Sequence, residues 1–430
     1  MLLLNNSTDK ERDGIFLRRI AIFCLVGCVQ FLLPSALAAQ SYGPPFIPTQ
    51  GTFRVLAVFV QFQDDTWDDP CPSDSLLGWP SNRHSIPKWA LGEKFLAPKK
   101  AKKYSEGSLS DYFAQMSNEQ FHFIGDVFPI LYLTPQPFAF YTDKTKHGRG
   151  FLSTQIIDWL DENGVDFSRY DNDNDGDVDF ILFLYRHWQH KILTPGTSYQ
   201  GISGFGFSKS ITKDNKRILG RFPGSGTMQR GNYTLPTCRS IVTHEISHYF
   251  FGAGHYSSIG EFGIHDGNAF CYAMSGYERE KLGWIHPIEI KRDTLLSIPD
   301  AITTNTYYKI DLPNSSDYFL LENRQRISIF EKGDCVEGEL PARGLMIAHI
   351  RPRASKAQQI TWIAADSTFS ENDKGEASDA LRAGDSIILK PLLHGRSDTA
   401  HDQLSIQVRV LRQKANRVIV RIKYKPTVNQ

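Results

Sequence analysis

The chain has 430 residues, enough for two domains that each bury a core. Its 48 lysine and arginine residues almost balance its 47 aspartate and glutamate residues, which leaves a formal net charge of +1. Because the chain is so close to neutral, charge gives no reason to expect a nucleic acid or an anionic membrane surface as a partner.

The first 38 residues have the pattern of a secretory signal. Two arginines precede an apolar stretch, Ile20–Leu33, and a small-residue cleavage site follows at Ala36–Ala38. Cleavage there would release an extracellular protein with no stable membrane partner. Two alternatives remain: Leu25–Cys28 is similar to a lipoprotein box, and the apolar run approaches the length of an uncleaved membrane anchor.

A short leader, residues 39–51, precedes a dense apolar run at Phe53–Val60, which predicts a buried strand. The polar, turn-rich residues Asp64–Pro80 indicate a surface excursion. Three further elements are predicted from hydrophobic periodicity: a helix at Ser108–Met116, a strand at Phe121–Val127 and an amphipathic helix at Phe151–Leu160.

An acidic run follows, with oxygen-bearing side chains at alternate positions and glycine in sixth place. This spacing predicts a calcium-binding loop whose candidate ligands are Asp171, Asp173, Asp175, Asp177 and Asp179. The twelfth position is Leu182 rather than glutamate, and an apolar strand at Phe180–Tyr185 follows instead of a helix. The loop is therefore not an EF-hand, and its alternative is a solvated acidic turn.

The run His-Glu-Ile-Ser-His at His244–His248 carries the strongest chemical signal. Residues four apart share one face of a helix, so His244 and His248 can bind one metal ion, and two imidazoles suit Zn²⁺. Glu245 can then act as a general base toward a metal-activated water. The sequence therefore predicts a zinc centre that hydrolyses peptide bonds.

Local signals place this run on a helix. Ser240 is the expected N-cap, and Gly252 with Gly254 can end the helix in a left-handed turn. An apolar stripe on the opposite side is expected to face the core: Val242, Ile246 and Phe250.

The third zinc ligand is expected to be His255. In the metzincin pattern H-E-x-x-H-x-x-G-x-x-H the glycine and the last histidine each stand one residue closer to the second histidine than Gly252 and His255 do here. The glycines make the wider turn pliable enough to return His255 to the metal. His265 and Asp266, in the next loop, are the alternatives.

After Trp284 the pattern changes to short alternating segments separated by polar turns. We expect strands at Tyr307–Leu312, Tyr318–Glu322, Gly344–Ile350, Leu404–Leu411 and Val418–Tyr424. The predicted fold is therefore α+β: a domain over residues 52–285, with a mixed sheet and the active-site helix, followed by a mainly antiparallel β domain over residues 286–430.

Four cysteines remain after signal cleavage: Cys71, Cys238, Cys271 and Cys335. An even number in an oxidising compartment predicts disulfides, and four cysteines permit three pairings. A bond between Cys238 and Cys271, which flank the metal helix, would brace the site and is a hypothesis. A cysteine-ligated zinc is the alternative, although no C-x-x-C spacing supports it.

Several segments, taken in order, resemble the immune inhibitor A family of secreted metallopeptidases over most of the mature chain. They are Ser110–Phe113 with Met116–Ser117, Gln120–Phe121 and Gly125, the acidic run ending at Asp175–Asp179, Met274–Glu278 with Leu282–Trp284, and Glu322–Gln325 with Gly344–His349. Asp366, Gly375 and Asp379 fit a later acidic segment of that family, a possible second cation site.

The resemblance implies a zincin-like catalytic domain, zinc bound by the motif residues, and extracellular proteolysis. Because the leader over residues 39–51 is short, latency imposed by a propeptide is not expected. The leading hypothesis is a secreted zinc endopeptidase that acts on protein or peptide substrates. The alternatives are a non-catalytic secreted binding or scaffold protein, and a gluzincin-type exopeptidase, which lacks a well-placed downstream glutamate because Glu261 lies too near His248.

Overall fold

The computed structural model describes residues 43–66, 79, 84–142, 147–187, 201–231, 234–266, 273–332, 342–366, 376, 378–390, 404–414 and 416–426. Contacts divide the chain into Met1–Pro44 and Pro45–Gln430, and the second unit carries the fold described below. The predicted signal segment, residues 1–38, lies outside the described residues. Among the residues that are described, no helix has both the length and the apolar character needed to cross a membrane.

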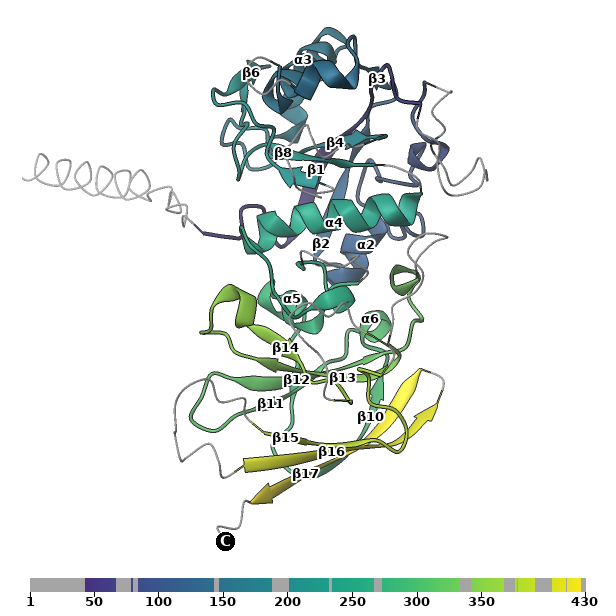
Figure 1. The fold of residues 1–430 in the computed structure, drawn as a ribbon, viewed down its shortest axis with the longest axis vertical. Helices are drawn as coiled ribbons and strands as arrows, with labels where there is room; N and C mark the ends of the chain where they lie inside the picture. Colours follow the sequence, from purple (N-terminus) through teal and green to yellow (C-terminus); the bar gives the residue numbers. More distant parts are fainter. Residues whose placement is uncertain are drawn as a thin grey trace, which may run out of the picture. The chain divides into compact units, whose positions relative to one another are not determined.

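The fold is α+β in class, and its first half is built on one mixed sheet (Figure 1). The described strands follow the order β2-β1-β4-β8-β5, with β3 beside β1; all neighbours run parallel except β5, which is antiparallel to β8 and forms an edge. Their bounds are β1 Gly51–Gln61, β2 Phe121–Val127, β3 Tyr132–Leu133, β4 Ile181–Tyr185, β5 Gly201–Ser203 and β8 Gly226–Arg230. A small hairpin pairs β6, Ile211–Lys213, with β7, Lys216–Ile218.

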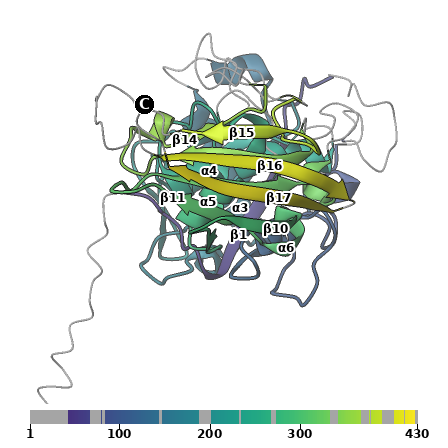
Figure 2. The same ribbon diagram turned by 90° about the horizontal axis from the view of Figure 1, so that it is seen from below.

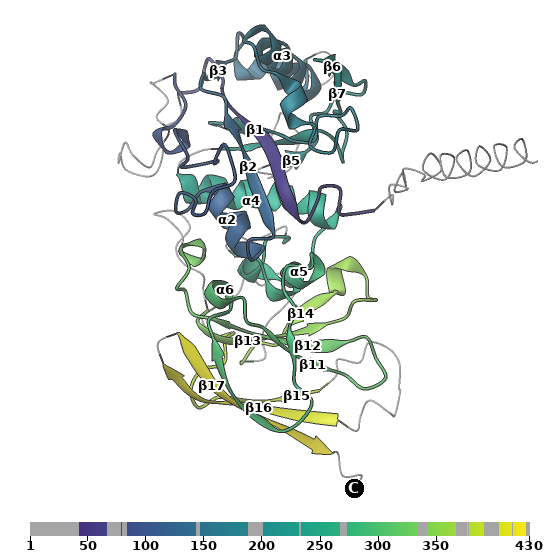
Figure 3. The same ribbon diagram turned by 180° about the vertical axis from the view of Figure 1, so that it is seen from behind.

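Helices cover both faces of this sheet because β1, in its interior, sends apolar side chains alternately to each face. One face of β1 packs with α2, Leu109–Met116, and α4, Leu235–Phe251. The other face packs with α3, Arg149–Glu162. Figure 3 shows α2 and α4 on the side of the sheet opposite to α3. The helix α4, which carries the His244–His248 motif, is thus packed against the sheet.

The second half contains two further sheets. One has the order β14-β13-β12-β11-β9 and the other β10-β17-β16-β15; every pair is antiparallel except β9 with β11. Figure 2 looks onto the second of these sheets. The bounds are β9 Ile288–Glu289, β10 Thr294–Pro299, β11 Tyr308–Asp311, β12 Tyr318–Arg324, β13 Gly344–Ile350, β14 Ile360–Trp362, β15 Ser386–Leu389, β16 Leu404–Lys414 and β17 Arg417–Pro426. Two short helices precede or join these strands: α5 Gly276–Lys281 and α6 Ala301–Thr304.

The sheet that contains β12 and β13 is buried on both faces. One face packs against the other antiparallel sheet, through residues such as Phe319, Ile347 and Val420. The opposite face, which includes Leu320 and Ala348, packs against the chain that follows α4. The loops around the candidate site therefore pack against this second face.

A buried ion group ties β12 to those loops. Arg324 Nε lies 2.5 Å from Glu331 and Nη1 lies 3.0 Å from Glu322, and all three side chains are fully buried. Arg324 also donates to the Phe262 carbonyl oxygen at 3.2 Å, and Glu322 accepts from the Gly276 N–H at 2.7 Å. Arg324 and Glu322, on one strand of the second half, thus bind the backbone of two segments of the first half.

The sequence predicted most of the long elements. The strands and helices predicted from the sequence are confirmed, and their ends differ by a few residues. They lie within residues 53–60, 108–127, 151–160, 180–185, 307–350 and 404–424. Of the predicted excursion at residues 64–80, residues 67–78 and 80 lie outside the described residues. The strands β5 and β8 were not predicted, because Gly201–Ser203 is only three residues long and Gly226–Arg230 is polar in sequence although most of it is buried.

We predict that Arg324→Met strongly destabilises the protein. Removing the guanidinium leaves two buried carboxylates without their counter-charge, which costs about 3–5 kcal/mol of the free energy of unfolding. Urea denaturation followed by circular dichroism measures the change. Lys291→Met is the control, because Lys291 pairs with Glu289 on the surface and should leave the midpoint unchanged. Equal losses in the two variants would contradict the role given to the buried ion group.

Candidate metal centre

The helix α4 begins earlier than the sequence predicted. Its N-cap is Thr234, whose hydroxyl accepts from the Thr237 N–H at 3.4 Å, so the expectation that Ser240 caps the helix is wrong. Pro236 falls in the first turn, where the backbone N–H groups have no partner within the helix, and a proline there costs no hydrogen bond. Ser240 is instead buried inside the helix.

The helix ends where the glycines predicted. The Gly252 N–H donates to the His248 carbonyl oxygen at 2.8 Å, and Gly252 has φ +82° while Gly254 has φ +76°. These values are strained for residues with a side chain, so the turn depends on glycine at both positions. The turn reverses the chain and carries His255 back toward the helix.

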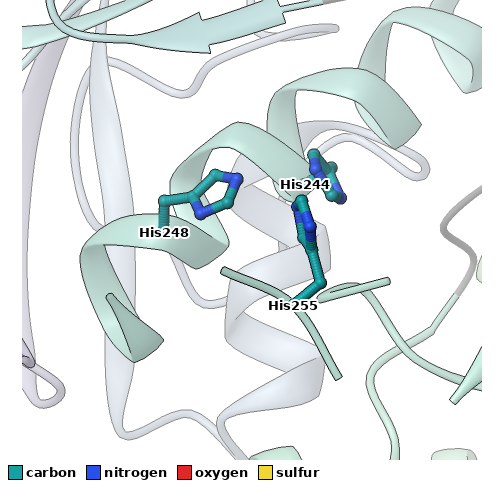
Figure 4. Close-up of side chains that lie close together, drawn as sticks. All are labelled: His244, His248 and His255. Atoms are coloured by element: carbon teal, nitrogen blue, oxygen red, sulfur yellow. The ribbon is translucent and has the colours of Figure 1, made fainter. Parts of the chain in front are cut away.

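The structure brings the three predicted histidines together. One ring nitrogen each of His244, His248 and His255 lies within 4.8 Å of the other two, and all three residues are half-buried (Figure 4). Nitrogens bound to one tetrahedral zinc at ~2.0–2.1 Å would stand ~3.3 Å apart. Small rotations of the rings therefore suffice to bind one ion.

Main-chain contacts orient two of these rings. His244 Nδ1 lies 3.0 Å from the Ile264 carbonyl oxygen, and His248 Nδ1 lies 3.3 Å from the Gly252 carbonyl oxygen. Because a carbonyl only accepts, Nδ1 carries the proton in both rings and Nε2 is the nitrogen able to bind a metal. His255 Nε2 is buried and has no hydrogen-bond partner among the described residues, and the same is true of His265 Nε2.

Burial keeps the three imidazoles neutral. Loss of solvation lowers the pKa of His244 to about 4 and that of His248 to about 3, and the neighbouring histidines add to both effects. Burial also lowers the pKa of His255, against the opposing charge of Asp266. A neutral imidazole is the form that binds a metal, so the site is ready for an ion at neutral pH.

The two alternative ligands lie beside the group rather than in it. His265 is fully buried, with Nδ1 2.5 Å from Ser247 Oγ, and is not part of the three-nitrogen cluster. Asp266 accepts from the Gly260 N–H at 3.1 Å, and its charge acts on His255. The geometry therefore favours His255 as the third ligand.

Glu245 lies at the same site and is 5% exposed. Burial raises the pKa of its carboxyl to about 8. A Cβ on Gly201 would lie 2.4 Å from Glu245 Oε1, so the carboxyl packs directly against the backbone of β5. Glycine is required there because any side chain would displace the carboxyl, and sequence periodicity gave no sign of this contact.

Glu245, the three histidines, β5 and Phe222 line one cleft of about 280 Å³. A larger cavity of about 440 Å³, beside α2 and α6, is lined by no histidine. The titratable cluster and the cleft therefore coincide, which is the combination expected of a site that performs chemistry.

A buried carboxylate that the sequence did not single out organises the loop beside His244. Glu278 accepts from the backbone N–H groups of Ile264, at 3.0 Å, and His265, at 2.9 Å, and from Ser275. It thereby holds the Ile264 carbonyl that orients His244. Glu278 is not part of the three-histidine group among the described residues.

The acidic loop brings together three of its five predicted ligands: Asp171, Asp173 and Asp179. Burial raises the pKa of Asp179 to about 7, as expected where carboxylates gather without a cation. Lys216 Nζ lies 2.6 Å from Asp171 and supplies part of the counter-charge. The donor set fits a hard cation such as calcium, which would compete with this lysine.

The other two predicted ligands, Asp175 and Asp177, make different contacts. Both carboxylate oxygens of Asp177 accept from Arg217, at 2.6 and 2.9 Å, and Asp175 Oδ1 accepts from the Asp177 N–H at 2.8 Å. In the C-terminal half, Asp366 and Asp379 lie together with Glu376, which the sequence did not suggest, while Gly375 lies outside the described residues.

Cys238 is a free, buried thiol, so the hypothesis that it pairs with Cys271 is wrong. Its side chain belongs to the apolar core between α4 and the sheet, where a cysteine behaves as a small hydrophobic residue. Cys71, Cys271 and Cys335 lie outside the described residues.

No protein-family model matches the chain, and no curated protein is similar to it. The resemblance to the immune inhibitor A family therefore rests on the sequence motifs and stays a prediction.

We predict that His255→Ala loses zinc during dialysis, whereas His265→Ala keeps one equivalent. The first change removes a nitrogen of the cluster, and the second removes a ring that packs behind it. Atomic absorption on the two proteins, purified and dialysed side by side, gives the stoichiometry. Full zinc in His255→Ala together with loss in His265→Ala would move the assignment to His265.

We also predict that calcium stabilises the protein through the acidic loop. At a free calcium concentration a hundred times the Kd, binding to the native state adds about 2.7 kcal/mol, seen as a higher melting temperature. Asp179→Asn should abolish the rise. Asp177→Asn is the matched control and should keep it, because that carboxylate is held by Arg217. A melting curve that does not change with millimolar calcium contradicts the prediction.

Proposed function

We propose that the mature protein is a secreted, zinc-dependent endopeptidase with a zincin-like catalytic domain, and that Glu245 is its general base. The observation that carries the proposal is the position of Glu245, which shares one cleft with the three-imidazole cluster. The sequence motifs point to the same chemistry independently.

The donor set suits zinc better than a hard cation. Three neutral imidazoles are borderline-soft ligands, and no carboxylate belongs to the cluster among the described residues. Zinc held by three protein ligands keeps a fourth position open, lowers the pKa of a water there to about 7 and polarises a carbonyl.

Glu245 has the position and the protonation range that a general base needs. The raised pKa of the Glu245 carboxyl holds when no cation is bound. The charge of a bound dication would lower this pKa toward neutral pH. The carboxylate can then accept a proton from the attacking water and deliver it to the leaving amine. The backbone of Gly201 fixes its orientation from behind.

A peptide substrate is supported by the strand that lines the cleft. The strand β5 pairs with β8 on one side only among the described strands, so its other side is an edge. An extended peptide can add to such an edge through main-chain hydrogen bonds, which places a peptide bond beside the cleft. Main-chain recognition suits an enzyme that cleaves within polypeptides.

A purely structural metal site is the competing explanation, and it corresponds to the non-catalytic binding or scaffold protein. Structural zinc sites are closed by four protein ligands, whereas the described cluster supplies three and faces a cleft. Such a site also has no use for a buried carboxylate beside it, because burying an unpaired carboxyl is unfavourable.

We predict that Glu245→Gln retains one equivalent of zinc and the native fold but loses at least ~100-fold in kcat on a casein-derived peptide, because an amide cannot accept the proton. Glu162→Gln, an exposed residue at the end of α3, is the control and should keep full activity. The proposal fails if folded, zinc-loaded Glu245→Gln hydrolyses the peptide at the wild-type rate.

A further inference from the structure

One lysine from the second half of the chain lies against the metal-binding turn. Lys356 begins a short 3₁₀ turn, Lys356–Gln358, in the loop that joins β13 to β14. The Arg351 N–H donates to the Gln359 carbonyl oxygen at 2.8 Å and closes the base of this loop. The lysine is therefore presented by a closed hairpin loop of the antiparallel sheet.

The Lys356 ammonium is the point on which four carbonyl groups converge. Nζ lies 2.8 Å from the carbonyl oxygen of Phe251, 2.9 Å from that of Gly252, 3.0 Å from that of Ala253 and 2.9 Å from that of Gly254. These carbonyls belong to the last residue of α4 and to the three residues after it, where helix carbonyls lack intrahelical partners and the helix dipole favours a cation. Three ammonium hydrogens shared among four acceptors leave none of these carbonyls without a donor.

One of these carbonyls also orients a ligand. The Gly252 oxygen accepts from Lys356 Nζ and lies 3.3 Å from His248 Nδ1. Lys356 and the His248 ring are thus joined through a single acceptor. A shift of that carbonyl would change the direction in which His248 presents Nε2.

The same loop also contacts the chain on the other side of His255. The Ser257 N–H donates to the Ala357 carbonyl oxygen at 3.2 Å. Lys356 therefore holds the residues just before His255, and Ala357 holds a residue just after it. The segment that carries the third histidine is fixed at both ends by two successive residues of one loop.

We propose that Lys356 is a positioning residue for the metal centre, and that its ammonium fixes the one-residue-wider turn so that His248 and His255 converge on one ion. The inference rests on the proposed zinc centre but assigns no chemistry to the lysine itself. Lys356 touches neither the reacting atoms nor the ion, and it acts through the turn and through the Gly252 carbonyl.

A second lysine offers a matched control. Lys281 Nζ lies 5.6 Å from the centroid of the Tyr256 ring, and Lys356 Nζ lies 5.8 Å from it. Lys281 donates to Gln359 Oε1 at 2.8 Å, in the same loop, and among the described residues it is Lys356, not Lys281, that donates to the turn at Phe251–Gly254. Replacing either lysine removes one positive charge from the same region, but only the replacement of Lys356 removes the hydrogen bonds to the turn.

The experiment compares Lys356→Met with Lys281→Met in the purified mature chain. We expect Lys356→Met to bind zinc 10–100-fold more weakly in competition with a chelator, the range found when partners that orient metal ligands are lost. The visible spectrum of the cobalt-substituted protein should change, because it reports ligand geometry. The kcat should fall while KM for a peptide stays the same. Lys281→Met should match the wild type in all three measurements.

Hydrogen exchange in the metal-free proteins tests the same contact without an ion. The segment from Gly252 to Ser257 should exchange faster in Lys356→Met than in the wild type or in Lys281→Met. If Lys356→Met does not fold, Lys356→Arg and Lys281→Arg give the comparison with both charges kept. A planar guanidinium cannot direct its donors at four converging carbonyls, so only the first should weaken zinc binding.

A folded Lys356→Met protein with wild-type zinc affinity and wild-type exchange at the turn would overturn the proposal, and so would equal losses in the two lysine variants. A wild-type protein that binds zinc but hydrolyses no peptide would instead refute the proposed function and leave the role of Lys356 intact. If the wild type binds no zinc, exchange at the turn still decides whether Lys356 holds it.

Discussion

In the proposed metal centre, three imidazoles must lie close together and each present one nitrogen to a common point, and this requirement depends on the contacts that hold the rings and the loops around them. A buried imidazole without partners is free to turn, and a mobile ring binds a metal poorly. Helix spacing settles only the places of His244 and His248 along α4. Their orientations come from the Ile264 and Gly252 carbonyls, which lie in segments without regular structure. The rings of His244 and His248 are therefore held no more rigidly than those two segments.

That dependence explains why the antiparallel sheet packs where it does. The loop at Ile264 is held by the buried carboxylate of Glu278, and the neighbouring segment is held by Arg324 through the Phe262 carbonyl. Trp362, on β14, donates to the Ile259 carbonyl oxygen at 2.9 Å. The contacts of Arg324 and Trp362 cross the boundary predicted at residues 285 and 286, whereas the contact of Glu278 with Ile264 lies before it. The half that ends at that boundary, taken alone, would lose two of the groups that hold the segment before Ile264.

The sequence predicted the parts of the site that depend on local geometry and missed those that depend on distant contacts. A spacing of four on a helix and glycine at a helix end are local rules, and they placed His244, His248 and the turn correctly. The helix start was wrong because a proline within the first turn looks like a helix breaker unless the cap at Thr234 is recognised. The contact between Gly201 and Glu245 joins residues far apart in sequence, and no periodicity signals it. The same is true of β8, whose polar sequence is buried only because strands flank it on both sides.

The extra residue in the turn illustrates how local and distant constraints combine. With glycine one position later than in the metzincin pattern, α4 continues through Phe251, and among the described residues no backbone N–H donates to its last carbonyl or to those of the next three residues. Left to water, these carbonyls would allow the turn several conformations, and His255 would sample several directions. A cation at their point of convergence selects one conformation. Lys356 supplies that cation from a loop whose own geometry is set by β13 and β14, so a longer turn in one half of the chain is matched by a single side chain in the other.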